Sequence, residues 1–172
     1  ECNNYPLVEY ICKQKKPIIL STGMNDIKSI TPSVRLFRKY KIPFALLHCT
    51  NIYPTDHKLV RLEAMIKMKK FFPDAIVGLS DHTEGIYTCL GAATLGAKII
   101  EKHFTDDRDR EGPDHKFALD PEKWTKMINE VRSLERVLGD GIKRLETNEL
   151  ETVVVQRRSL FWSKDLKTGE VI

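Results

Sequence analysis

Two histidines and a glutamate stand at matching positions behind two short apolar runs of the sequence. In the segment GLSDHT, Ser80 and His82 are two residues apart. In the segment IIEKHFT, the same spacing separates Glu101 from His103. Side chains two residues apart on an extended strand point to the same side. Two such strands, paired about 4.8 Å apart, would bring both imidazoles and the carboxylate into one small space, which suits a divalent metal ion and an oxygen-rich substrate.

His82 and His103 are therefore the candidate metal ligands. A single histidine at a strand end is more often an ordinary core or surface residue, and this alternative stays open for each of them. The sequence offers two nitrogens and no cysteine close to them, so a closed four-ligand zinc site is not expected. An open site for Mn²⁺ or Mg²⁺, completed by waters and substrate oxygens, fits the pattern better.

Two carboxylates near these histidines are the candidate catalytic groups. Glu101 shares a face with His103 and could hold a water or act as a general acid or base. Glu101 could instead have only a structural role, as a buried carboxylate paired with Lys102 or Lys98. Asp114 lies in the rigid turn GPDH, where aspartate commonly forms an Asx-turn. Its place in the loop after the same apolar run makes contact with a substrate hydroxyl the functional reading.

Further polar side chains stand just past the ends of the apolar runs. Such residues commonly cap the next helix, and this alternative is as strong as a functional one. Together with backbone N–H groups at helix N-termini, they could instead cradle an anion. The candidates for substrate binding are Ser21, Asn51, Tyr53 and Ser80.

The elements that position these residues alternate between apolar runs and amphipathic segments. Strands are expected at 17–20, 42–48, 75–79 and 97–102, and helices at 26–40, 59–71, 85–95 and 121–138. This alternation predicts an α/β fold with right-handed βαβ units and a parallel sheet. Each expected strand ends in a polar cluster, namely STG, HCTN, SDHT and EKHFT. Since (β/α)₈ barrels build their active sites at that end, we expect half of a TIM barrel rather than a small open sheet.

Composition limits the class of protein and its partners. The 172 residues are 41% hydrophobic and 30% charged, with a net charge of +4, which is typical of a soluble globular domain. The basic residues are scattered, so no nucleic-acid partner is expected. No apolar run approaches the roughly 20 residues that span a bilayer, so no membrane partner is expected either. Four cysteines without paired spacing favour a reduced, cytoplasmic protein.

The chain changes character near residue 140. Residues 1–140 carry the alternating pattern, whereas 141–172 have few large apolar residues and then a β-branched run, TVVV. We interpret 141–172 as a linker followed by the first strand-like residues of a second domain. The sequence starts at Glu1 and stops in LKTGEVI, and both ends are interpreted as cut ends.

Six segments of the chain, in order and with compatible spacing, resemble bacterial N-acetylneuraminate (sialic acid) synthases. They are ECNNYPLVEYI, KPIILSTGM, LLHCTNIYPT, GLSDHT, IEKHFTDDRDREGPDH and RRSLFWSKDLKTGEVI. The resemblance covers essentially the whole chain. It implies strands five to eight of a (β/α)₈ barrel, followed by a linker towards an antifreeze-like domain.

The resemblance implies a transferase that forms a carbon–carbon bond. C3 of phosphoenolpyruvate adds to the aldehyde carbon of N-acetylmannosamine, water attacks C2, and phosphate leaves to give N-acetylneuraminate. His82 and His103 match the family's ligands for Mn²⁺ or Mg²⁺, and the metal would polarise the sugar aldehyde. Glu101 matches the carboxylate that acts through the water of the metal. Asp114 resembles the residue that holds the amino sugar.

The remaining candidates match the family's substrate contacts. Tyr53 lies near the sugar, and Ser21, Asn51 and Ser80 look like phosphoenolpyruvate contacts. Other family groups have no counterpart in this sequence: lysines and a glutamate on the first four strands, and an arginine from the antifreeze-like domain of the partner in a domain-swapped homodimer. We therefore expect the isolated 172-residue chain to be catalytically inactive.

Three alternatives stay open. The first is a legionaminic or pseudaminic acid synthase, which shares the machinery but takes a 2,4-diacetamido hexose. The second is a metal-dependent barrel hydrolase or aldolase, against which the lack of a third strong ligand counts. The third is a sugar- or phosphate-binding module without catalysis.

Overall fold

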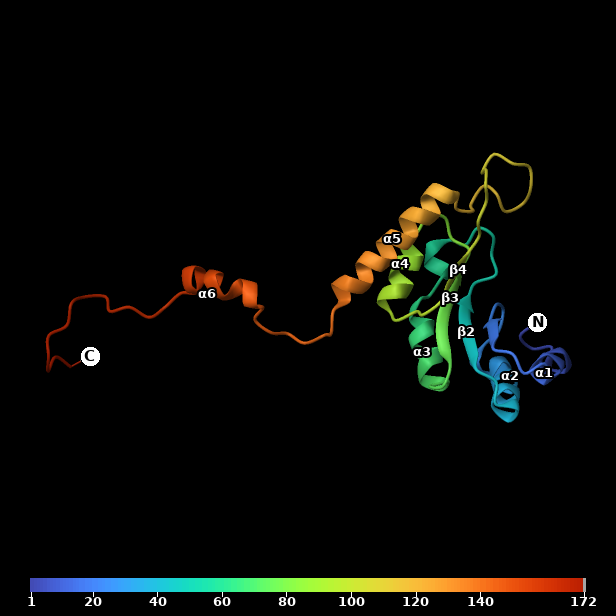
Figure 1. The fold of residues 1–172 in the computed structure, drawn as a ribbon, viewed down its shortest axis with the longest axis horizontal. Helices are drawn as coiled ribbons and strands as arrows, with labels where there is room; N and C mark the ends of the chain where they lie inside the picture. Colours follow the sequence, from blue (N-terminus) through green and yellow to red (C-terminus); the bar gives the residue numbers. More distant parts are fainter. Residues whose placement is uncertain (172) are drawn as a thin grey trace. The chain divides into compact units, whose positions relative to one another are not determined.

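A computed structural model describes residues 1–171 and separates the chain into two units at Gly139. The first unit, Glu1–Gly139, is built on one four-stranded parallel sheet in the order β1-β2-β3-β4 (Figure 1). The strands are β1 (Ile18–Ser21), β2 (Phe44–Cys49), β3 (Ile76–Asp81) and β4 (Ile100–Lys102). The helices are α1 (Tyr5–Lys13), α2 (Ile27–Tyr40), α3 (Glu63–Phe71), α4 (Tyr87–Thr94) and α5 (Pro121–Leu138). This arrangement confirms the α/β fold and is the sheet of half a TIM barrel.

The register of the strands brings their polar ends into line. Ser21 lies opposite Leu47, Cys49 opposite Ser80, and Ser80 opposite Glu101. Because residues in register on parallel strands face the same side, these five side chains share one face of the sheet, which we call the inner face. The sheet therefore carries its polar groups to one edge of the inner face.

The opposite, outer face is covered by helices. Leu46, Val77 and Leu79 of this face belong to one buried apolar cluster with Val34 of α2 and Met65 of α3. A second cluster, under α4 and α5, contains Cys89, Leu119 and Met127. By contrast, Ile19 and Ile76 on the inner face are 60% and 50% exposed. The inner face of this unit is thus partly exposed, although Leu47 on the same face is only 1% exposed.

Helix α2 begins at a complete capping box. Asp26 Oδ1 accepts from the N–H of Ser29 at 2.8 Å, and Ser29 Oγ accepts from the N–H of Asp26 at 3.1 Å. We expect Asp26→Ala to lower the free energy of unfolding by about 1 kcal/mol, because an N–H group in the first turn of the helix loses its acceptor. Urea unfolding measures this change. Asp26→Asn keeps an acceptor and is the control; a loss of the same size in Asp26→Asn would show that charge rather than capping matters.

Several element bounds differ from the sequence-based expectation. Helix α1 was not expected; it begins at a cap where Asn4 Oδ1 accepts from the N–H of Leu7. The second expected helix, α3, starts at Glu63 instead of residue 59, because Arg61 takes a left-handed conformation with φ of 52°. A short 3₁₀ turn at His57–Leu59 precedes that break.

The second unit, residues 140–171, contains the 3₁₀ turn η2 (Thr147–Glu149) and helix α6 (Leu150–Gln156). The expectation that its β-branched run forms strand-like residues was wrong, since Thr152 to Val155 lie inside α6. Strand propensity depends on pairing and packing, and no strand is present between residues 140 and 171 to pair with. The antifreeze-like domain and the domain boundary at 140 stay predictions.

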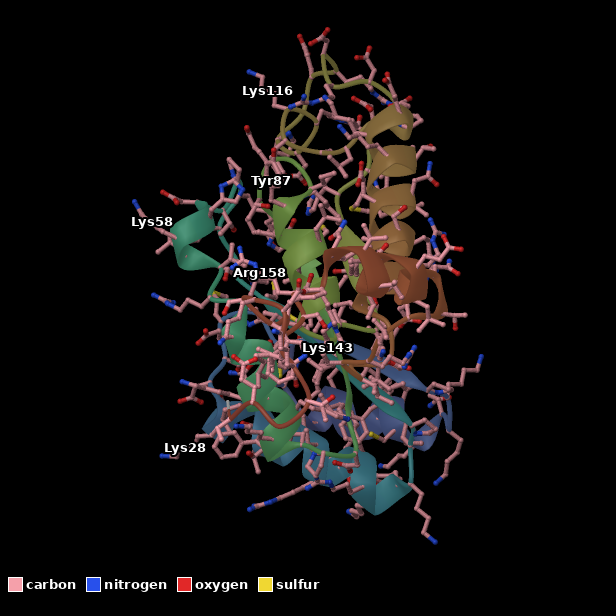
Figure 2. The ribbon with its side chains drawn as sticks, turned by 90° about the vertical axis from the view of Figure 1, so that its left-hand side faces the viewer. Lys28, Lys58, Tyr87, Lys116, Lys143 and Arg158 are labelled. Carbon is pink, nitrogen blue, oxygen red and sulfur yellow. The ribbon has the colours of Figure 1, made fainter. Side chains whose placement is uncertain are left out.

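Charged side chains extend from separate segments of the first unit. Lys28, Lys58 and Lys116 are exposed and point away from the fold (Figure 2). None of the helices formed by residues 1–171 combines the length and apolar character needed to cross a lipid bilayer.

Candidate functional site

His82 and His103 lie next to each other at the ends of β3 and β4. Their ring centroids are 5.2 Å apart, and the ring planes meet at 81°. A metal bound by a ring nitrogen at about 2.1 Å lies about 3.3 Å from the ring centroid, so rings up to about 6.6 Å apart can share one ion. The separation of the two rings is therefore compatible with a single shared cation.

The position of His82 is set by backbone groups of the connection after β2. Its Nδ1 lies 2.9 Å from the carbonyl oxygen of Thr50, and its own carbonyl accepts from the N–H of Thr55 at 2.9 Å. A carbonyl can only accept, so Nδ1 carries the proton and donates. In the neutral ring Nε2 then carries a lone pair, as in most protein ligands of this type. Burial acts to lower the pKa of His82, but contacts with Cys49 and the carbonyl of Thr50 outweigh it and hold this pKa above its usual value.

His103 is held between a carboxylate and an aromatic ring. Its Nδ1 is 3.6 Å from Asp114 Oδ2, and its ring centroid is 5.0 Å from that of Phe117. Burial lowers the pKa of His103 below its usual value, although the charge of Asp114 acts in the opposite direction. The ring is thus biased towards the neutral form that can bind a metal.

Glu101 contacts a serine on the neighbouring strand. Ser80 Oγ donates to Glu101 Oε1 at 2.7 Å. The alternative that Glu101 pairs with Lys102 was wrong, because the ammonium group of Lys102 binds Asp81 on the other face of the sheet. Alternation along β4 sends the two side chains to opposite sides, so Glu101 is exposed on the inner face while Lys102 is buried.

Tyr53 covers the pair of histidines. Its ring centroid is 4.2 Å from that of His82 and 5.8 Å from that of His103. The side chain nevertheless remains 52% exposed. One edge of the phenol is thus available to a ligand on the inner face.

Cys49 and Asn51 meet beside the histidines at the end of β2. The thiol of Cys49 donates to Asn51 Oδ1 at 2.9 Å and lies 4.0 Å from His82 Nδ1. The expectation that no cysteine lies near the histidines was therefore wrong. Burial acts to raise the pKa of the Cys49 thiol, but contacts with His82, Ser21 and Ser80 outweigh it and hold this pKa below its usual value.

Asn51 also approaches the loop after β1. A Cβ atom on Gly23 would lie 3.2 Å from Asn51 Nδ2, so the amide packs directly over this glycine. Ser21 is exposed at the end of β1, close to Cys49. The structure thus brings all eight candidate residues to the same edge of the sheet, with Asp114 reaching it from the long loop.

The protein groups at this edge fit an open metal site. Among residues 1–171, no three His, Cys, Asp or Glu side chains are arranged to hold a metal ion together. His82 and His103 would supply two nitrogens, and waters and substrate oxygens would have to complete the coordination. The other histidines make separate contacts, for example His48 with the carbonyl of Val60 and His115 with Thr105 Oγ1.

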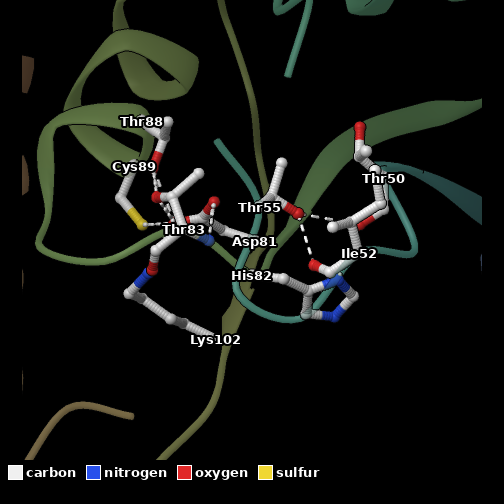
Figure 3. A network of polar contacts seen from close by, with 9 residues as sticks. All are labelled: Thr50, Ile52, Thr55, Asp81, His82, Thr83, Thr88, Cys89 and Lys102. Carbon is white, nitrogen blue, oxygen red and sulfur yellow. Dashed lines mark hydrogen bonds and ion pairs between the residues drawn. The ribbon is translucent and has the colours of Figure 1, made fainter. Parts of the chain in front are cut away.

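One cluster near the site was missed in the sequence. Asp81 and Lys102 form an ion pair of 2.6 Å on the outer face, with Thr83, Thr88 and Cys89 around the carboxylate (Figure 3). The usable signal was a charged residue immediately before each histidine, as in SDH and EKH. Charge alone did not reveal that the two residues meet behind the sheet.

Known proteins with related sequences share this fold. The chain matches the NeuB family over residues 1–143. It is 40% identical to an N,N'-diacetyllegionaminic acid synthase and 39% identical to a pseudaminic acid synthase, both from Campylobacter jejuni; each match covers 99% of this chain and about half of the relative, 52% and 50%. The crystal structure of an N-acetylneuraminic acid (sialic acid) synthetase from Leptospira borgpetersenii superposes with a TM-score of 0.82 at 33% identity, over 90% of this chain and 54% of that one.

The resemblance drawn from the sequence motifs is confirmed by these matches. The chain spans about half the length of the curated relatives it matches. The family match over residues 1–143 includes both histidines, and the superposed crystal structure covers 90% of this chain. The chain therefore belongs to the NeuB family.

Proposed function

We propose that this chain supplies the metal- and sugar-binding half of a sugar acid synthase that condenses phosphoenolpyruvate with an N-acetylated amino sugar. The observation that carries the proposal is the placement of His82, His103 and the Ser80–Glu101 pair on one inner face, at the C-terminal ends of parallel strands. Barrels of this type build their active sites at that end. Membership of the NeuB family supports the same reaction class.

The protein groups have separate tasks in this proposal. A bound Mn²⁺ or Mg²⁺ would act as a Lewis acid on the aldehyde oxygen of the sugar. Glu101, oriented by Ser80 Oγ, holds a water and through it passes a proton to the aldehyde oxygen as this oxygen becomes a hydroxyl. Asp114 and Tyr53, which flank the histidines, hold the hydroxyl and acetamido groups of the sugar.

Phosphoenolpyruvate is assigned to the other end of the same edge. Ser21, Asn51 and Ser80 offer hydroxyl and amide groups on three neighbouring strands or their ends. Ser21, the amide of Asn51 and backbone N–H groups can donate to a carboxylate or phosphate there, and Ser80 would join them when its single hydroxyl proton turns from Glu101 to the ligand. C3 of phosphoenolpyruvate would bond to the aldehyde carbon, and the aldehyde oxygen would take up a proton to become a hydroxyl. Water would add to C2 and give up a proton, and the C2–O bond to phosphate would then break, leaving a ketone at C2 and free phosphate.

The identity of the sugar has two candidates. The first is N-acetylmannosamine, which gives N-acetylneuraminate, and the second is a 2,4-diacetamido hexose; the motif TNIYPT favours the neuraminate or legionaminate type. The named relatives that make legionaminic and pseudaminic acids are 40% and 39% identical, whereas the sialic acid synthetase is 33% identical. A 2,4-diacetamido hexose is therefore supported at least as well. A cytoplasmic, domain-swapped homodimer with an antifreeze-like domain belongs to the same proposal.

A competition assay with the full-length protein tests this function. We expect phosphate release from phosphoenolpyruvate only when Mn²⁺ and an N-acetylated amino sugar are both present. Equimolar N-acetylmannosamine and 2,4-diacetamido hexoses in one reaction, followed by mass spectrometry of the sugar acid, identify the sugar. Phosphate release without any sugar, or a product formed from pyruvate, would instead indicate a hydrolase or an aldolase.

A further inference from the structure

Asp81 and Lys102 form a buried ion pair directly behind the two histidines. Lys102 Nζ lies 2.6 Å from Asp81 Oδ2, and each side chain is only 1% exposed. Asp81 immediately precedes His82, and Lys102 immediately precedes His103. Since consecutive residues of a strand face opposite sides, the ion pair lies on the outer face while the rings lie on the inner face. In Figure 3 the His82 ring points away from the cluster around Asp81.

The hydrogen-bonded ladder between β3 and β4 ends at this ion pair. The last registered position of the two strands joins Asp81 to Lys102. His82 and His103 follow at once, beyond that final position. Within residues 1–171, strand pairing between β3 and β4 therefore stops just before His82 and His103, and strand hydrogen bonds do not fix the distance between these two side chains.

The ammonium group of Lys102 holds the chain on both sides of His82. Besides the carboxylate of Asp81, it donates to the carbonyl oxygen of Thr83 at 2.6 Å. Asp81 is the residue before His82, and Thr83 is the residue after it. A single group on β4 thus fixes the backbone that carries His82 relative to the backbone that carries His103.

The carboxylate of Asp81 is in turn oriented by its own loop and by α4. The N–H of Thr83 donates to Oδ1 at 3.1 Å, and the hydroxyl of Thr88 donates to Oδ2 at 2.6 Å. The thiol of Cys89 lies 3.5 Å from Oδ2. The ion pair therefore has a fixed direction as well as a fixed distance.

We propose that Asp81 and Lys102 are positioning residues that hold His82 and His103 at the separation one metal ion requires. A buried ion pair is often no more stabilising than apolar residues of the same volume, so stability alone explains it poorly. Groups behind metal ligands commonly tune metal affinity by setting the orientation of the ligands. The metal-binding part of this role rests on the proposed function, whereas the effect on ring separation does not.

The decisive variant removes both charges while keeping the volume, Asp81→Asn combined with Lys102→Met in the full-length protein. We expect its Mn²⁺ dissociation constant, measured by electron paramagnetic resonance, to rise roughly 10- to 100-fold. Nuclear Overhauser contacts between the two imidazole rings, 5.2 Å apart by their centroids, are expected to weaken or vanish in the metal-free protein.

Two further variants separate positioning from stability. Val34→Ala opens a cavity in the core under α2, away from the histidines, and should lower the melting temperature with unchanged Mn²⁺ affinity. Asp81→Asn alone keeps one acceptor oxygen, which can still accept from the N–H of Thr83, but its amide nitrogen cannot accept from Thr88 or Lys102, so the hold on Lys102 weakens. This single variant should raise the Mn²⁺ dissociation constant by a smaller factor than the double variant does. If the double variant does not fold, the single variant tests the positioning role in its place.

Two outcomes would overturn the positioning role, and a third would separate it from the proposed function. A folded double variant, or a folded Asp81→Asn variant, with wild-type ring contacts would overturn the proposal. So would a change in Mn²⁺ affinity no larger than that of Val34→Ala. If the wild-type protein forms no sugar acid, but its ring contacts still depend on Asp81 and Lys102, the proposed function fails while the positioning role stands.

Discussion

Replacing His82 by alanine in the full-length protein should reduce kcat/KM for sugar acid formation roughly a thousandfold. Lewis-acid polarisation by a metal contributes several kcal/mol to a transition state, and each step of about 1.4 kcal/mol is a factor of ten in rate. The variant should lose Mn²⁺ binding at the same time, since only His103 would then supply a nitrogen at this edge. Phosphate-release kinetics and a Mn²⁺ titration measure the two losses.

A second histidine provides the matched control for this experiment. His57 is exposed in the short turn before α3, and no role in the site is assigned to it. We expect His57→Ala to retain both activity and Mn²⁺ affinity. If His82→Ala keeps its Mn²⁺ affinity and only loses thermal stability, the histidine pair is structural and the proposed function lacks its foundation.

Replacing Gly78 by alanine should destabilise the first unit by about 3 kcal/mol or more. A Cβ atom there would lie 2.4 Å from the carbonyl oxygen of Ile99 and 2.7 Å from Cδ2 of Leu47. The carbonyl is part of the backbone that leads into β4, so relief requires the strands to move apart. Overpacking of this kind costs about 1–3 kcal/mol, and occasionally more. Because the new methyl group meets a backbone carbonyl, we expect a cost at the upper end of this range. Denaturant unfolding of the two proteins gives the difference.

The control for Gly78 is a glycine whose new methyl group meets a flexible neighbour. A Cβ atom on Gly91, inside α4, would touch only Cδ1 of Leu62 at 2.8 Å. Alanine also has a higher helix propensity than glycine by about 1 kcal/mol. Gly91→Ala should thus be nearly neutral. If Gly78→Ala were as neutral as Gly91→Ala, β4 would have to move away from β3 without any loss of stability, and the prediction would be wrong.

Local signals in the sequence gave the right positions for some elements and not for others. Helices α2 and α5 carry their own start signals, Asp26 as a cap and Pro121 in the first turn, and their bounds agree with expectation. The break at Arg61 has no such signal, because a left-handed conformation of arginine is imposed by the surrounding chain. The β-branched run in α6 likewise follows its context rather than its propensity.

The site residues show the same difference between local signals and contacts that the whole fold determines. The spacing of Ser80 with His82, and of Glu101 with His103, was readable because alternation on a strand is a local rule. The approach of Cys49 to His82 depends on the register between β2 and β3, which no local pattern encodes. The same holds for the contact between Asp81 and Lys102.

Alternation along β3 and β4 gives this half-barrel two surfaces that can change independently. Tyr53 and Asp114, which we propose to contact the sugar, lie on loops in front of the sheet, whereas the buried charges of Asp81 and Lys102 lie behind it. Under the proposed function, substitutions in these loops could therefore change which sugar is bound without altering the buried ion pair behind the sheet. A directed-evolution library confined to those loops would draw on the same separation.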